Sequence, residues 1–133
     1  MIDTIINITN LRKKYFNLNL NIYLDEDSFL GLRDESEYNF GSNIIIKSKM
    51  NKNSIFEYFR LNSFLKTTKN HFIHDIEISS NCEFRHVNFS NGSDEMHNKT
   101  SVSLNDENAS YEGSGVMISN STNSNNDLLI KES

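Results

Sequence analysis

Phe16-Asn-Leu-Asn-Leu-Asn-Ile-Tyr-Leu24 is the most regular stretch of the sequence, because apolar side chains alternate strictly with asparagine or tyrosine. Successive side chains of a β-strand point to opposite faces, so this alternation indicates a strand with one buried face. Acidic and hydroxyl residues at 25–28 provide turn chemistry before a second apolar segment at 29–32. A hairpin is the simplest connection between two such segments.

Further strands are expected on both sides of this hairpin. Isoleucines on one face favour a strand over residues 2–8, and a β-branched run favours another over 38–47. Apolar and acidic side chains alternate over 71–79, and 82–89 form a last apolar segment. The pattern is therefore mainly β.

One helix is expected, over about residues 54–66. Ser54-Ile-Phe-Glu57 matches a capping box, in which the serine and glutamate side chains each satisfy a free backbone amide of the first turn. The apolar residues of this segment cover more than half of a helix circumference, and strand alternation fits them less well. A helix packed between a sheet and a second element is implied.

The order of strands, helix and strands predicts an α+β fold. If residues 2–8 lie outside the barrel, the order matches a small OB-like barrel, in which a helix closes one end between the third and fourth strands. A PH-like barrel or a curved antiparallel sheet with the same elements is the alternative. No family motif is recognised in the sequence.

The two parts of the chain differ in composition. Residues 1–89 contain all nine phenylalanines and form the expected core domain, whereas residues 90–133 are rich in serine, asparagine and acidic side chains. A segment this polar buries too little apolar area to offset the entropy lost on ordering. It is expected to be a largely flexible acidic tail with short apolar islands at 102–104, 116–118 and 128–130.

The sequence does not assemble the residues that an enzyme needs. Its five glycines are scattered, so neither a P-loop nor a dinucleotide-binding fingerprint is present. His71, His74, Cys82 and His86 offer metal donors, but the first two point to opposite faces of a strand and the others lack a standard zinc spacing. Cys82 and His86 are also too far apart on a strand for direct proton transfer. No catalytic residue, metal or cofactor is expected.

The outward face of the strand at 16–24 is the first candidate binding surface. Tyr15 and Tyr23 flank asparagine amides on it, and stacking of a nucleic acid base on a tyrosine ring contributes about 1 to 3 kcal/mol. Lys13 and Lys14 come just before the strand and are placed to follow a phosphate backbone.

Lys47 and Lys49 belong to the second candidate feature, a basic cluster that is the one electrostatic feature suited to an anionic partner. The 21 asparagines stand beside a single alanine and no proline, which indicates coding bias. The asparagines themselves are therefore given no functional role.

These features predict a non-enzymatic binding or adaptor domain. It would act as a subunit or modulator of a protein assembly, through an exposed β surface and the tail, with strand addition or peptide docking as the mode of contact. An OB-like module for single-stranded nucleic acid is the alternative, although the net charge of −5 opposes it. An inhibitor or immunity-type protein is the third interpretation.

The cellular location follows from absent features. A single cysteine, Cys82, excludes an internal disulfide and favours a reducing compartment. No apolar run reaches the roughly eighteen residues of a membrane span, and no basic, apolar leader follows Met1. An intracellular protein of the cytoplasm or nucleus, without a membrane partner, is expected.

Overall fold

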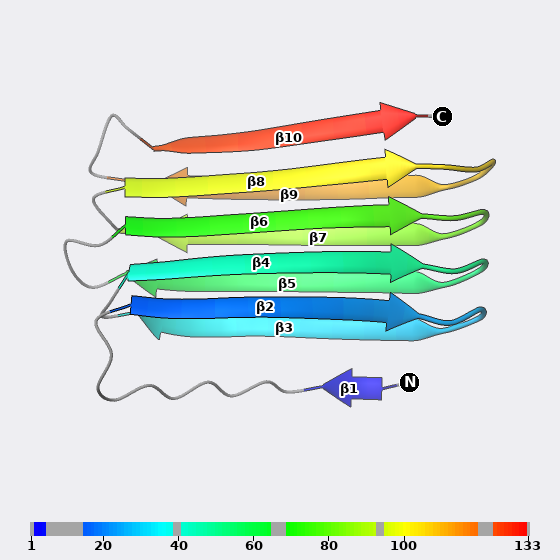
Figure 1. Ribbon diagram of the computed structural model, residues 1–133, viewed down its shortest axis with the longest axis horizontal. Coiled ribbons are helices and arrows are strands. Elements are labelled where there is room, and N and C mark those ends of the chain that lie inside the picture. Colours follow the sequence, from blue (N-terminus) through cyan, green and yellow to red (C-terminus); the bar gives the residue numbers. More distant parts are fainter. Residues whose placement is uncertain are drawn as a thin grey trace.

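The computed structural model describes residues 2–4, 15–38, 41–64, 69–92, 95–119 and 124–132. Within these ranges the chain forms ten β-strands and no helix (Figure 1). The strands are β1 (Ile2–Thr4), β2 (Tyr15–Leu24), β3 (Phe29–Tyr38), β4 (Gly41–Met50), β5 (Ile55–Phe64), β6 (Lys69–Ile78), β7 (Glu83–Asn91), β8 (Glu95–Leu104), β9 (Ser110–Ile118) and β10 (Asn125–Glu132).

The strands form two sheets in which neighbouring strands are parallel. Sheet A has the order β1-β3-β5-β7-β9, and sheet B has the order β10-β8-β6-β4-β2. Paired residues are 26 to 28 positions apart in the chain, as when Phe29 pairs with Ile55 and Ile55 pairs with Glu83. Each coil of the chain adds one strand to each sheet, and Figure 1 shows the coils stacked along one axis. The fold is a β-solenoid of about four coils.

The OB-like or PH-like barrel and the curved antiparallel sheet predicted from the sequence are wrong. The turn at 25–28 joins β2 of sheet B to β3 of sheet A, so these two strands lie in facing sheets and do not pair as a hairpin. The strands predicted at 16–24, 71–79 and 82–89 do overlap β2, β6 and β7. The alternation of apolar and polar residues indicates which face of a strand is buried, but it does not indicate which strand lies beside it.

The helix predicted over 54–66 is also wrong, because this segment contains strand β5. Phe56 points into the core and is fully buried, whereas Phe59 points outward and is 38% exposed. Apolar side chains on both faces conceal the alternation in the sequence. The Ser54 hydroxyl donates to the carbonyl oxygen of Asn51 at 2.6 Å and stabilises a turn between the sheets rather than a helix end.

The C-terminal region is not the mostly flexible tail predicted from its polar composition. It contains β8, β9 and β10, and the first two of these pair along their length with β6 and β7 of the preceding coil. A parallel neighbour satisfies the backbone groups of each new strand, so few apolar residues are needed to order it. Val102 supplies one of them and is fully buried.

A ladder of side-chain hydrogen bonds connects the turns that follow β2, β4, β6 and β8. Asp27, Asn53, Asn81 and Asn108 have φ values of 56° to 60°, in the left-handed region that asparagine and aspartate tolerate better than most residues. Each asparagine amide donates to the residue of the preceding coil, at 3.0 Å to Asp27 and at 3.2 Å to Asn53 and Asn81. These asparagines have a structural role that coding bias does not explain.

Substitution of Asn81 separates the two contributions of this ladder. Asn81→Ala removes two hydrogen bonds and places a β-carbon in a left-handed conformation, so we expect it to lower the free energy of unfolding by about 2 kcal/mol. Asn81→Gly removes the same hydrogen bonds without the strain, and we expect a loss of about 1 kcal/mol. Urea unfolding followed by circular dichroism measures both. Lys52→Ala, an exposed change in a turn, should cost under about 0.5 kcal/mol, and equal losses in all three variants would contradict the ladder.

The core lies between the two sheets and changes character along the strands. Apolar side chains fill the end next to the ladder, where Met50, Phe56, Ile78 and Phe84 are fully buried. The other end is polar and is lined by buried asparagine and serine side chains: Ser42, Asn62, Asn70, Asn88, Ser90 and Asn98. Ser42 donates to the amide oxygen of Asn70 at 2.8 Å, as a buried polar pair requires.

Arg60 is the largest side chain that is almost completely enclosed in this interior, with an exposed fraction of 1%. Its Nε lies 3.5 Å from a carboxylate oxygen of Asp34, and its guanidinium carbon lies 3.8 Å from the centre of the Phe72 ring. Its Nη1 donates to the amide oxygen of Asn98 at 3.5 Å. A carboxylate, an aromatic face and an amide together compensate for the lost hydration of the buried charge.

Candidate binding surfaces

Outward side chains stack in rows that cross the coils. Parallel strands in register bring equivalent positions of successive coils to within about 4.8 Å of each other. One such row on sheet B consists of Tyr23, Lys49, Glu77, Ser103 and Lys131. The solenoid thereby converts residues far apart in the sequence into two outer faces.

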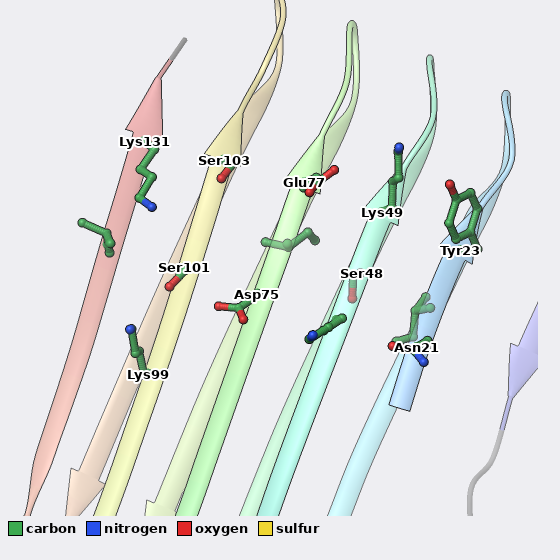
Figure 2. A pocket seen from close by; sticks show the side chains of 14 residues that line it. Asn21, Tyr23, Ser48, Lys49, Asp75, Glu77, Lys99, Ser101, Ser103 and Lys131 are labelled. Carbon is green, nitrogen blue, oxygen red and sulfur yellow. The ribbon is translucent and has the colours of Figure 1, made fainter. Parts of the chain in front are cut away.

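A shallow depression of about 600 Å³ lies on the outer face of sheet B, toward the ends of the strands (Figure 2). Figure 2 shows Tyr23 and Lys49 on neighbouring strands, with the carboxylates of Asp75 and Glu77 beside them on β6. The ammonium nitrogen of Lys49 lies 6.0 Å from the centre of the Tyr23 ring, at the outer limit of a cation–π contact. Aromatic, basic and acidic groups therefore share this surface.

Four lysines and two carboxylates line this depression, so the carboxylates offset part of its positive charge. Lys47 is in register with Asp75, and Lys49 is in register with Glu77. A phosphate that approaches either lysine also approaches the neighbouring carboxylate, which weakens the attraction. The carboxylates of β6 separate the lysines of β4 from Lys99 and Lys131, so the basic groups of the depression do not form a continuous groove.

The structure places three of the sequence-predicted binding residues together: Tyr23, Lys47 and Lys49 all point outward from sheet B and are exposed. Tyr15 begins the same strand but is eight residues from Tyr23, so the backbone positions of the two residues lie about 26 Å apart along an extended strand. The side chain of Tyr15, together with Lys13 and Lys14, lies outside the described residues.

The outer face of sheet A carries a different surface, which we call the apolar strip. It consists of Phe59, Leu61, Val87, Val116 and Ile118, which are 37% to 54% exposed. Phe59 is in register with Val87 on the neighbouring strand. Sequence reasoning missed this strip because it assigned Phe59 and Leu61 to a buried helix. An exposed cluster of large apolar side chains is typical of an interaction surface.

Paired charges border the apolar strip. Arg33 forms an ion pair with Glu35, and its guanidinium carbon lies 5.7 Å from the centre of the Phe59 ring. Arg85 bonds to Glu83 at 2.7 Å and to Glu57 at 2.8 Å. The hydrogen bond to Glu83 and, to a smaller extent, the one to Glu57 raise the pKa of Arg85. A hollow of about 440 Å³ lies among these side chains, so the strip has an apolar centre and a charged border, as many protein interfaces do.

The four residues considered as metal donors do not converge. His74 and His86 point into the core, with ring centres 6.3 Å apart, whereas His71 points outward. Cys82 is buried under a turn, where its thiol donates to the carbonyl oxygen of Asn51 at 2.8 Å. Burial lowers the pKa of His74 to about 3 and that of His86 to about 4. Both rings are therefore neutral at pH 7. His74 is completely buried, whereas His86 is 5% exposed and lies beside a small hollow of about 80 Å³.

Near the starts of the sheet B strands, a second polar cluster lies on the outer face. His97 Nε2 lies 2.9 Å from a carboxylate oxygen of Glu95, and His97 Nδ1 lies 2.6 Å from the amide oxygen of Asn125. The bond to Glu95 raises the pKa of His97, and the same bond, together with Lys69, lowers the pKa of Glu95. The ring of His71 is 5.0 Å from that of His97, centre to centre. His97 was not singled out from the sequence, because its partners come from three different coils.

None of the described residues forms a helix long and apolar enough to cross a membrane. Comparison of the chain with protein-family models, with curated proteins and with solved structures gives no match.

Proposed function

We propose that this protein is a non-enzymatic binding module of a protein assembly and that the apolar strip on sheet A is its docking surface. The observation that carries this proposal is the exposure of five large apolar side chains, 37% to 54% each, on the outer face of sheet A. Covering them with a partner removes apolar area from water, which is favourable by about 25 cal/mol per Å².

The border of the strip supports a protein as the partner. Arg33 and Arg85 are each already paired with carboxylates of the same face, so they offer little attraction to a polyanion. Aromatic and arginine side chains around an apolar centre are the groups enriched in protein interfaces. A partner that presents apolar side chains and a few hydrogen-bonding groups matches this surface.

Single-stranded nucleic acid is supported less well. Tyr23 and Lys49 are contiguous, as base stacking beside a phosphate contact requires. The carboxylates of Asp75 and Glu77 lie in register with Lys47 and Lys49, however, and they oppose a phosphate backbone at the same place.

A charge placed in the strip tests the proposal. Leu61→Lys should reduce partner capture at least tenfold, because it buries an ammonium group in an apolar interface, while it lowers the free energy of unfolding by under about 1 kcal/mol. Leu129→Lys is the matched control, since Leu129 is 43% exposed on the opposite sheet and Leu61 is 37% exposed. The measurement is affinity capture from an extract of the source cells, with quantitative mass spectrometry of the bound proteins.

Capture of the same proteins at the same level by both variants would contradict the strip as docking surface. Sedimentation of the purified chain then tests whether the partner is a second copy of this chain or a different protein. Self-association that Leu61→Lys abolishes and Leu129→Lys preserves would identify the partner as a second copy of the chain.

A further inference from the structure

We propose that His71, Glu95 and His97 form a binding site for one transition-metal ion of the Zn²⁺ class. One nitrogen of each histidine and one carboxylate oxygen of Glu95 all lie within 4.8 Å of one another. The three side chains are partly exposed, so an ion reaches them from solvent. The cluster lies on sheet B, opposite the apolar strip, and does not depend on the docking proposal.

The backbone fixes the three donors on one face. Glu95 and His97 are two residues apart on β8 and therefore point the same way, and His71 on β6 is in register with His97. Metal bonds of about 2.0 to 2.1 Å in a tetrahedral site place donors roughly 3.3 Å apart. Rotation of the side chains alone closes the difference from 4.8 Å, because the strands already hold the three backbones at neighbouring positions.

Asn125 positions His97 for this role. His97 Nδ1–H donates to the amide oxygen of Asn125 at 2.6 Å, so Nε2 is the nitrogen that binds the ion, which would replace the proton that Nε2 shares with Glu95 in the metal-free chain. Metal-binding histidines generally donate their second nitrogen in this way, which sets both the tautomer and the ring orientation. The ion would lie between His97 Nε2 and the Glu95 carboxylate, within reach of the His71 ring.

The donor set selects the type of ion. Two imidazole nitrogens and one carboxylate suit Zn²⁺, Co²⁺, Ni²⁺ and Cu²⁺, whereas Mg²⁺ and Ca²⁺ prefer oxygen ligands. Three protein ligands leave at least one coordination position for water. Lys69, whose Nζ lies 3.2 Å from the second carboxylate oxygen of Glu95, opposes a cation at this place.

Titration of the untagged full chain tests the site. We expect calorimetry with ZnCl₂ to give one ion per chain, and Co²⁺ to give the visible absorption bands of a low-symmetry site with nitrogen ligands. His71→Asn and His97→Asn should each weaken Zn²⁺ binding at least tenfold. Asparagine is compatible with this row, because Asn43 and Asn125 already occupy it on the flanking strands.

Two further variants and a control sharpen the result. Lys69→Ala should strengthen binding by removing a positive charge, and Asn125→Ala should weaken it about tenfold through the lost support of His97. Lys99→Ala, two residues along the same face of β8, should bind as the wild type does. Absence of Zn²⁺ binding at 0.1 mM metal, or unchanged affinity in folded His71→Asn and His97→Asn, would overturn the proposal.

Discussion

Acidification from pH 7 to pH 4.5 should destabilise the fold by roughly 2 to 3 kcal/mol for each of the two buried histidines, which together is a large part of the stability of a domain this size. Burial holds the pKa of folded His74 at about 3 and that of His86 at about 4, against an ordinary value of 6.5, with the Arg60 charge adding to both shifts. Between these values and 6.5 the unfolded chain binds protons that the folded chain does not bind. Stability is therefore full above pH 6.5 and falls as the pH decreases.

Urea unfolding at both pH values measures this loss, and His86→Phe identifies its source. Phenylalanine keeps the stacking on Tyr58, whose ring centre is 5.4 Å away, and removes an Nε2 that has no hydrogen-bond partner among the described residues. We expect this variant to lose about half of the pH dependence. His71→Asn, at the outer face of sheet B, should retain all of it. An unfolding midpoint that is equal at both pH values would show that the folded interior accepts the protons.

Phe56→Ala should lower the free energy of unfolding by about 3 to 5 kcal/mol, because it leaves a cavity at a fully enclosed position. The Phe56 ring lies 5.2 Å from that of Phe84 and 6.1 Å from that of Tyr58, centre to centre. Phe59→Ala, three residues along the same strand, changes an outward side chain that is 38% exposed and should cost under about 1 kcal/mol. Denaturant titration of both variants gives the comparison.

This pair of substitutions also distinguishes the strand from a helix. Residues three apart lie on the same side of a helix but on opposite faces of a strand. Similar losses of unfolding free energy for Phe56→Ala and Phe59→Ala would thus contradict the placement of Phe56 inside and Phe59 outside on β5. A large loss for Phe56→Ala alone would support it.

How much of the fold can be predicted depends on how well each strand separates apolar from polar side chains. In β2, leucines and isoleucine point inward and asparagines outward, so the strand is readable from the sequence. In β5, Arg60 and Asn62 are buried while Leu61 between them is exposed. A charged residue inside and an apolar residue outside reverse the usual pattern, and no local rule recovers the strand.

Parallel pairing was missed for another reason: its signal lies in the turns and not in the strands. An asparagine or aspartate with a small residue directly after it recurs in each coil, as Asp27-Ser28, Asn53-Ser54, Asn81-Cys82 and Asn108-Ala109. The spacing varies between 26 and 28 residues and the surrounding letters differ, so the repeat is faint. The same repeat, once recognised, would have placed β8 and β9 in the fold.

The candidate surfaces, like the fold, could be predicted from the sequence only where the information lies within a single strand. Tyr23 was assigned to the outward face from alternation within one strand, and it lies there. The apolar strip and the cluster of His71, Glu95 and His97 combine residues from neighbouring coils, so they depend on the register between strands. That information is not contained in any single segment.

The turn ladder has a direction, and the direction makes the two ends of the solenoid chemically different. Every amide in it donates toward the N-terminal end, and Asp27, which stands there, has only acceptor oxygens. The ladder does not reach the edges of the sheets, because β10 continues sheet B past β8 and β1 continues sheet A past β3. Open sheet edges invite growth into fibres. Growth of this solenoid by a second copy in the same direction would pair β9 and β10 of one molecule with β1 and β2 of the next, and the turn ladder would be interrupted at that junction.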